Sequence, residues 1–202
     1  MAVLTVARQG QVSRSKRDGL KGRRFGLVRA LLLLLTPFVL AADIRANVST
    51  EYKIKAAFLY NFAKFVEWPA ERFDTETSPI VIGVLGENPF GPELEKIALE
   101  RKVNGRPVSI VMLRSLAEEK SVHLLFVCAG QEKRFAASDV VKRAGVLTVG
   151  ESAVFAAAGG TITFTRPDDK VRFEINMDSA NCAGMRISAQ LQKLASVVRK
   201  KS

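Results

Sequence analysis

The run Ile80-Val81-Ile82-Gly83-Val84-Leu85-Gly86 is apolar along its whole length and ends at a glycine. A strand without polar alternation is buried on both faces, which is typical of the interior of a parallel sheet. Three later runs have the same character: residues 107–113, 122–128 and 146–149. Together the four runs predict four parallel strands.

Helical segments separate these strands, from about Pro89 to Leu99 and from about Phe135 to Arg143. Such crossovers place helices on both faces of a parallel sheet. The chain then changes character, because residues 161–165 and 170–176 alternate apolar and polar side chains around the turn Pro167-Asp168-Asp169. That alternation predicts an antiparallel hairpin with one wetter face.

Two amphipathic helices are expected at the ends of the domain. The first covers residues 51–67 and stops at Trp68-Pro69, since proline cannot extend a helix. Its apolar stripe excludes Lys53, Lys55 and Lys64 and consists of Ile54, Ala57, Phe58, Phe62, Phe65 and Val66. The second runs from about Met185 to Arg199, with a stripe of Ile187, Leu191, Leu194, Ala195 and Val198.

The whole pattern predicts one α/β domain over residues 43–202. We expect a six-stranded, mostly parallel sheet with a C-terminal antiparallel hairpin, flanked by about five helices.

Residues 1–42 have the three parts of a secretory signal peptide. Eight of the 31 basic residues and one acid lie there, followed by an apolar stretch from Ala30 to Leu40 and then Ala41-Ala42. The apolar stretch is shorter than the about 20 residues that a membrane span needs. We expect cleavage near Ala41 or Ala42 and a periplasmic location; an uncleaved membrane anchor is the alternative.

The formal charge of +11 belongs mostly to this leader. The remainder has 23 basic and 19 acidic residues, a net of +4, with the two signs interspersed. A nucleic-acid binder needs a clustered basic face, so we expect no nucleic-acid partner.

Two cysteines, Cys128 and Cys182, and a single histidine, His123, remain after the leader. They cannot supply a tetrahedral metal site, and we expect no metal. In an oxidising compartment the pair is a candidate disulfide, while two free thiols are the alternative.

No motif of a known catalytic or nucleotide-binding site is present. Gly83, Gly86 and Gly91 have neither the dinucleotide-binding nor the Walker spacing, so we expect no cofactor. His123 lies in a buried-looking strand, which favours a structural imidazole over a catalytic base, and no Gly-x-Ser-x-Gly elbow accompanies it. We therefore expect no enzyme; a hydrolase that uses His123 is the least favoured reading.

Three segments resemble the YfiR family. They are Tyr52 to Pro69 (YKIKAAFLYNFAKFVEWP), Gly83 to Gly91 (GVLGENPFG), and Val171 to Asn176 (VRFEIN) with Ala180 and the segment 185–195 that follows. The resemblance covers nearly all of residues 49–199 in the same order.

The resemblance implies a periplasmic negative regulator. Such proteins bind the periplasmic sensor region of an inner-membrane diguanylate cyclase and lower cyclic-di-GMP; an outer-membrane lipoprotein can sequester them, and they can form homodimers. A regulator of this kind needs a surface that prefers one conformation of its partner. The candidate partner-binding residues are Phe173, Glu174, Asn176 and Arg186, with a core role for Phe173 and an ordinary surface role for Glu174 as the alternative.

A periplasmic small-molecule binder is the main alternative function. Ligands of parallel sheets bind outside the carboxyl ends of the strands, which here lie near Gly86, Cys128 and Gly150.

Overall fold

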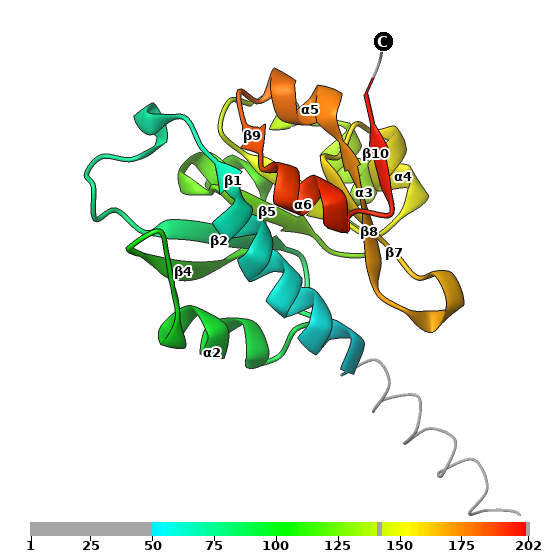
Figure 1. Cartoon of the computed structure of the whole chain (residues 1–202), viewed down its shortest axis with the longest axis horizontal. Helices are drawn as coiled ribbons and strands as arrows, with labels where there is room; N and C mark the ends of the chain where they lie inside the picture. Colours follow the sequence, from blue (N-terminus) through cyan, green and yellow to red (C-terminus); the bar gives the residue numbers. More distant parts are fainter. Residues whose placement is uncertain (1–49, 141–142, 201–202) are drawn as a thin grey trace, which may run out of the picture. The chain divides into compact units, whose positions relative to one another are not determined.

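The computed structural model describes residues 50–140 and 143–200 (Figure 1). The predicted signal peptide over residues 1–42 lies outside this range. Within the described residues, no helix combines the length and apolar character that crossing a membrane requires.

The centre of the fold is a parallel sheet, as predicted. β2 (Ile80–Leu85) pairs in parallel with β4 (Arg106–Leu113) on one side and β5 (Leu124–Val127) on the other. β6 (Leu147–Gly150) and β7 (Ile162–Thr165) extend the parallel part beyond β5. The strand order of this part, 4-2-5-6-7, reverses between β2 and β5.

The predicted hairpin is also present. β8 (Arg172–Asn176) pairs antiparallel with β7, and the register places Phe164 opposite Phe173. Two short strands complete the eight-stranded sheet: β3 (Lys102–Val103) beside β4, and β10 (Val197–Arg199) beside β8. The predicted number of six is therefore wrong, because strands of two and three residues are too short for an apolar period to reveal them.

Both faces of the central strands of the sheet are buried. Leu124 and Phe126 of β5 belong to one apolar cluster, while Leu125 and Val127 belong to the other. The first cluster is covered by the helix of residues 50–65, α2 (Glu93–Glu100), α5 (Met177–Cys182) and α6 (Ala189–Leu194). The second is covered by α3 (Glu132–Ala136) and α4 (Ala153–Ala157).

The first helix occupies residues 50–65, close to its predicted span. Its buried face is rotated from the predicted stripe: Lys55 is 3% exposed, whereas Ile54 is 44% exposed. The face that packs on the sheet consists of Lys55, Ala56, Leu59, Phe62 and Ala63. The rotation is possible because carboxylates neutralise the buried ammonium group of Lys55.

The predicted final helix from Met185 to Arg199 is wrong. The segment divides into β9 (Arg186–Ile187), α6 and β10, and β9 pairs antiparallel with β1 (Val66–Glu67). Ser188 caps α6 by accepting a hydrogen bond from the backbone N–H of Leu191. Ser196 then donates both its N–H and its hydroxyl to the Phe173 carbonyl, which holds the chain extended beside β8.

Candidate partner-binding surface

Phe173 is a core residue. It is 1% exposed, and its ring centroid lies 5.0 Å from that of Phe62 and 5.4 Å from that of Phe58. The alternative interpretation is therefore confirmed: this side chain holds the first helix against β8 and has no exposed area to offer a partner.

Asn176 ends β8 and starts α5. Its side-chain oxygen accepts hydrogen bonds from the N–H groups of Asp178 and Ser179, at 3.1 and 3.2 Å. This is an N-cap, which satisfies donors that a helix start would leave unpaired. Asn176 thus has a complete structural role.

Arg186 lies apart from the other three predicted residues. It is exposed on β9, in register with Glu67 of β1, in a two-stranded sheet separate from the main one.

Glu174 forms an ion pair with Arg199, a residue that the sequence did not single out. The Glu174 carboxylate accepts from the Arg199 guanidinium at 2.6 Å, and the two side chains are 24% and 63% exposed. The parallel pairing of β8 with β10 brings them together across 25 positions of sequence. The signal that could have indicated this strand is Ser196-Val197-Val198, a serine followed by two β-branched residues.

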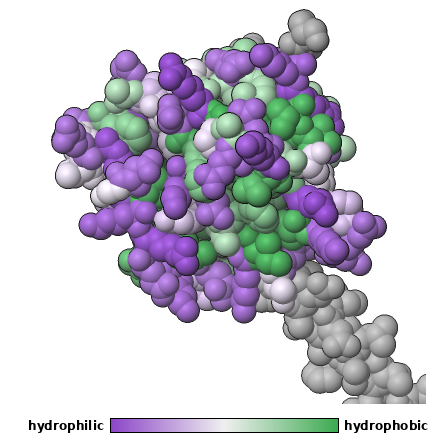
Figure 2. All heavy atoms as spheres, in the orientation of Figure 1, coloured by the Kyte–Doolittle hydropathy of each residue, from purple (hydrophilic) through white to green (hydrophobic). Residues whose placement is uncertain are grey.

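β10 is the most exposed strand of the sheet. Val197 is 42% exposed and Val198 is 40% exposed, and Arg199 is exposed as well. Figure 2 shows a hydrophobic area over β10 and the neighbouring α4, among mostly hydrophilic surroundings.

A groove of about 420 Å³ lies beside this strand. Ala153, Ala156 and Ala157 of α4 form part of its wall, and Glu174 and Arg199 form another part. α4 approaches the sheet closely because Gly160 has no side chain: a Cβ atom there would lie 2.1 Å from the Phe155 ring. We call β10, the Glu174–Arg199 pair and this groove the β10 surface.

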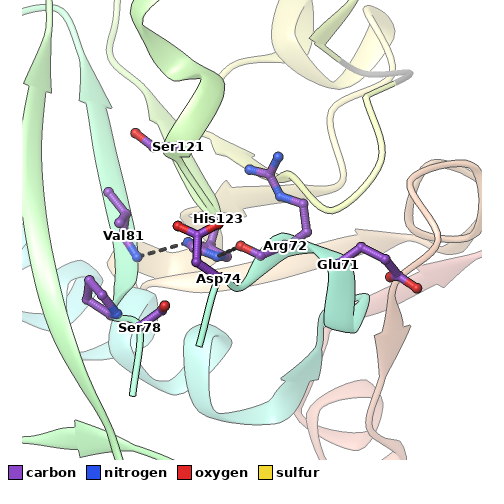
Figure 3. Close-up of a pocket in the computed structure, with 8 residues that line it drawn as sticks. Glu71, Arg72, Asp74, Ser78, Val81, Ser121 and His123 are labelled. Carbon is purple, nitrogen blue, oxygen red and sulfur yellow. Dashed lines mark hydrogen bonds between the residues drawn. The ribbon is translucent and has the colours of Figure 1, made fainter. Parts of the chain in front are cut away.

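A second pocket, of about 440 Å³, contains His123 (Figure 3). The imidazole is 4% exposed; its Nδ1 accepts from the Val81 N–H at 3.1 Å, so its Nε2 is the donor to the Arg72 carbonyl at 3.2 Å. Phe73 stacks on the ring at 4.6 Å. Burial lowers the pKa of His123.

Both ring nitrogens of His123 are therefore occupied by backbone groups. A general base needs one nitrogen available as an acceptor for the proton it takes. The prediction of a structural imidazole, with both ring nitrogens hydrogen-bonded, is confirmed. His123 therefore has no free nitrogen with which to act as the base of a hydrolase.

A third pocket, of about 250 Å³, lies at the carboxyl ends of β2, β5 and β6, between Glu87, Cys128 and Glu151. Glu151 is already engaged: it accepts from the Tyr52 hydroxyl at 2.9 Å and from the Lys55 ammonium group. Lys55 also pairs with Glu51 at 2.5 Å. This network joins the first helix to the sheet, and burial raises the pKa of Tyr52.

The two cysteines are free thiols in the structure, so the predicted Cys128–Cys182 disulfide is not formed there. Cys128 is buried in the core at the end of β5, whereas Cys182 is exposed at the end of α5. Burial, followed by the nearby carboxylates Glu151, Glu132 and Glu87, raises the pKa of the Cys128 thiol to about 12. Across the described ranges, no group of three or more histidine, cysteine or acidic residues is placed to hold a metal ion.

A YfiR/HmsC-like family model matches residues 52–196, from the first helix to the residue before β10. No curated protein matches the chain. Because the match covers well over half of the 202 residues, the chain belongs to the YfiR/HmsC-like family.

Proposed function

We propose that this protein is a periplasmic regulator that binds the periplasmic sensor region of an inner-membrane diguanylate cyclase and restrains it, lowering cyclic-di-GMP. Membership of the YfiR/HmsC-like family over residues 52–196 is the observation that carries the proposal. An outer-membrane lipoprotein that competes for the protein, and a homodimer, are part of the same proposal.

The side chains of the molecule support binding rather than catalysis. The buried side chains of Lys55 and His123 are bonded to other groups of the domain, as in the Lys55–Glu151 and His123–Val81 contacts. The exposed apolar side chains of β10 lie instead beside a groove and an accessible ion pair. A preformed surface of this kind is what a regulator needs in order to favour one state of its partner.

The proposal is tested by measuring cyclic-di-GMP after deletion of the gene. Deletion is expected to raise cyclic-di-GMP and matrix production, and the full chain supplied in trans should restore both. A copy without residues 1–42 should fail to restore them, because it stays in the cytoplasm, away from the sensor region. Suppressor mutations of the deletion should fall in a membrane-bound cyclase.

Unchanged cyclic-di-GMP in the deletion strain would overturn the proposal. Full restoration by the copy without residues 1–42 would refute the periplasmic site of action.

Charge-reversal variants then locate the contact. Arg199→Glu removes the pairing with Glu174 and reverses a charge that is 63% exposed. The affinity for the sensor region should therefore fall by about tenfold, equivalent to about 1.4 kcal/mol, and repression should weaken with it. Glu174→Lys and Arg186→Glu test the two predicted charged residues in the same way. Lys96→Glu, on the exposed side of α2 at the other end of the sheet, is the matched control and should repress normally. Circular dichroism checks the folding of each variant.

The small-molecule binder is the second candidate, and the pocket at the carboxyl ends of β2, β5 and β6 is the observation in its favour. Thermal shift against a panel of metabolites tests it. A stabilising compound whose effect is lost in Glu87→Gln would support this function.

A further inference from the structure

The outer edge of β10 presents backbone groups that the sheet does not use. Ser196 donates its N–H to the Phe173 carbonyl of β8 at 2.9 Å. Asn176 donates its N–H to the Thr161 carbonyl on the β7 side, so Ile175 directs its backbone groups toward β10. The parallel register places Val198 opposite Ile175, so Val197 and Arg199 direct their backbone groups toward β8. Because successive residues of a strand direct these groups to opposite edges, the N–H and C=O of Val198 point away from β8. Among the described residues, β8 is the only strand that pairs with β10.

Basic residues predominate around this edge, although Glu174 and Glu151 also line the neighbouring groove. From Ser179 to Ser202 the chain has five basic residues and no acid. Three of these, Lys193, Arg199 and Lys200, are exposed on α6, on β10 and directly after it. Basic residues protect an edge strand from pairing with copies of itself, since two such strands side by side repel each other. The same charges attract an acidic segment.

The side chains of the edge favour an extended, partly apolar segment. Val197 and Arg199 lie on the same face of β10, since side chains alternate along a strand. Arg199 lines the 420 Å³ groove beside α4, and Val197 is 42% exposed next to it. A strand added to β10 would place alternate side chains over this groove while its acidic groups meet Arg199 and Lys200.

We propose that the partner's sensor region contributes an extended segment with acidic and apolar residues, which adds to β10 as the next strand of the sheet. Addition of a strand to an exposed edge obtains its affinity from backbone hydrogen bonds and its specificity from alternate side chains. This inference rests on the proposed function and specifies how the partner binds.

The first experiment places a photo-crosslinking amino acid at position 197 of the full chain, expressed in its own cells. Leu99 on α2, which is 89% exposed, is the control position. Irradiation should join position 197, and not position 99, to a membrane-bound cyclase that mass spectrometry identifies, through a segment with net negative charge. A product that contains a second copy of the chain, equal products from both positions, or no product from position 197 would overturn the inference.

The second experiment separates the edge from the rest of the surface. Val198→Pro removes a backbone donor that points away from β8, whereas Val198→Thr keeps the donor and the β-branched shape. Repression in the deletion strain should fall at least tenfold further with Val198→Pro than with Val198→Thr. The two purified proteins should have the same circular dichroism and melting temperature.

If Val198→Pro unfolds the domain, Arg199→Glu is the second test of the edge, with cross-linking from position 197 as its readout. If Arg199→Glu leaves the yield of cross-linked product unchanged, the inference that the segment is acidic is wrong. The two levels of inference fail differently: if deletion leaves cyclic-di-GMP unchanged, the proposed function is wrong. If deletion raises it and folded Val198→Pro represses like the wild type, only the edge contact is wrong.

Discussion

Charged groups are buried and paired beneath the first helix, whereas those at the β10 edge are exposed. Lys55, 3% exposed, is enclosed by Glu51 and Glu151, and a hydrogen bond from Tyr52 to Glu151 completes the network. At β10, Arg199 is 63% exposed and pairs with a single carboxylate, that of Glu174, in contact with solvent. In the first arrangement the charged groups are already paired within the domain, so they stabilise the fold and offer a partner no unpaired group. The second leaves charge, apolar area and backbone donors accessible, which is the property of a recognition surface.

Removing the buried ammonium group should have the largest effect on stability. Lys55→Ala leaves the Glu151 carboxylate without its cation and close to Glu51, which keeps its ion pair with Arg166. This should lower the free energy of unfolding by roughly 3–5 kcal/mol. Lys53→Ala is the control, because Lys53 is 55% exposed and lies 3.7 Å from Glu93; it should change stability by less than about 1 kcal/mol. Urea denaturation measures both, and equal small effects would contradict the contrast between interior and edge.

The His123 contact predicts a pH dependence of stability that the edge does not have. The pKa of His123 is lowered in the folded protein, so the unfolded chain binds the proton more readily. The contribution of His123 to the free energy of unfolding is therefore fully present above the ordinary histidine pKa of about 6.5. It is lost as the pH falls from there to the folded-state pKa. His123→Asn can still accept from the Val81 N–H without titrating, and its melting temperature should be less sensitive between pH 7 and pH 5. The same pH slope in both proteins would contradict this role for His123.

The exposed ion pair should contribute little to folding. Arg199→Ala is expected to lower the free energy of unfolding by less than about 1 kcal/mol, because a pair in contact with solvent gains little over hydration. Urea denaturation at low and high salt checks the value. A loss as large as that of Lys55→Ala would mean that β10 is a structural strand and not an open edge.

The thiols should differ in reactivity without any change in stability. In the native protein Cys182 is exposed and should react with a thiol reagent, whereas Cys128 is buried with its pKa raised to about 12 and should react only after unfolding. Titration should give one thiol per chain before denaturation and two after it. Protein from a periplasmic extract that gives no thiol under denaturing, non-reducing conditions would show that the disulfide forms after all.

The sequence by itself determined the parallel centre of the sheet, the antiparallel hairpin and the first helix. Each has an apolar pattern that follows from its own burial: continuous in β2 and β5, alternating in β8, and helical in residues 50–65. The same patterns indicated that His123 is structural, since a lone histidine in a buried strand is satisfied by its neighbours.

Tertiary structure decided the remainder, because it depends on partners far away in the chain. The segment 185–199 has apolar residues at helical spacing, yet pairing of β9 with β1 and of β10 with β8 breaks it into separate elements. Lys55 interrupts a buried helical face, which the carboxylates of Glu51 and of Glu151, 96 residues from Lys55, make stable. The Glu174–Arg199 pair exists because two strands lie side by side, and no local pattern encodes that neighbourhood. Local periodicity reports how deeply a segment is buried, whereas its contact partners are set by the free energy of the whole packed chain.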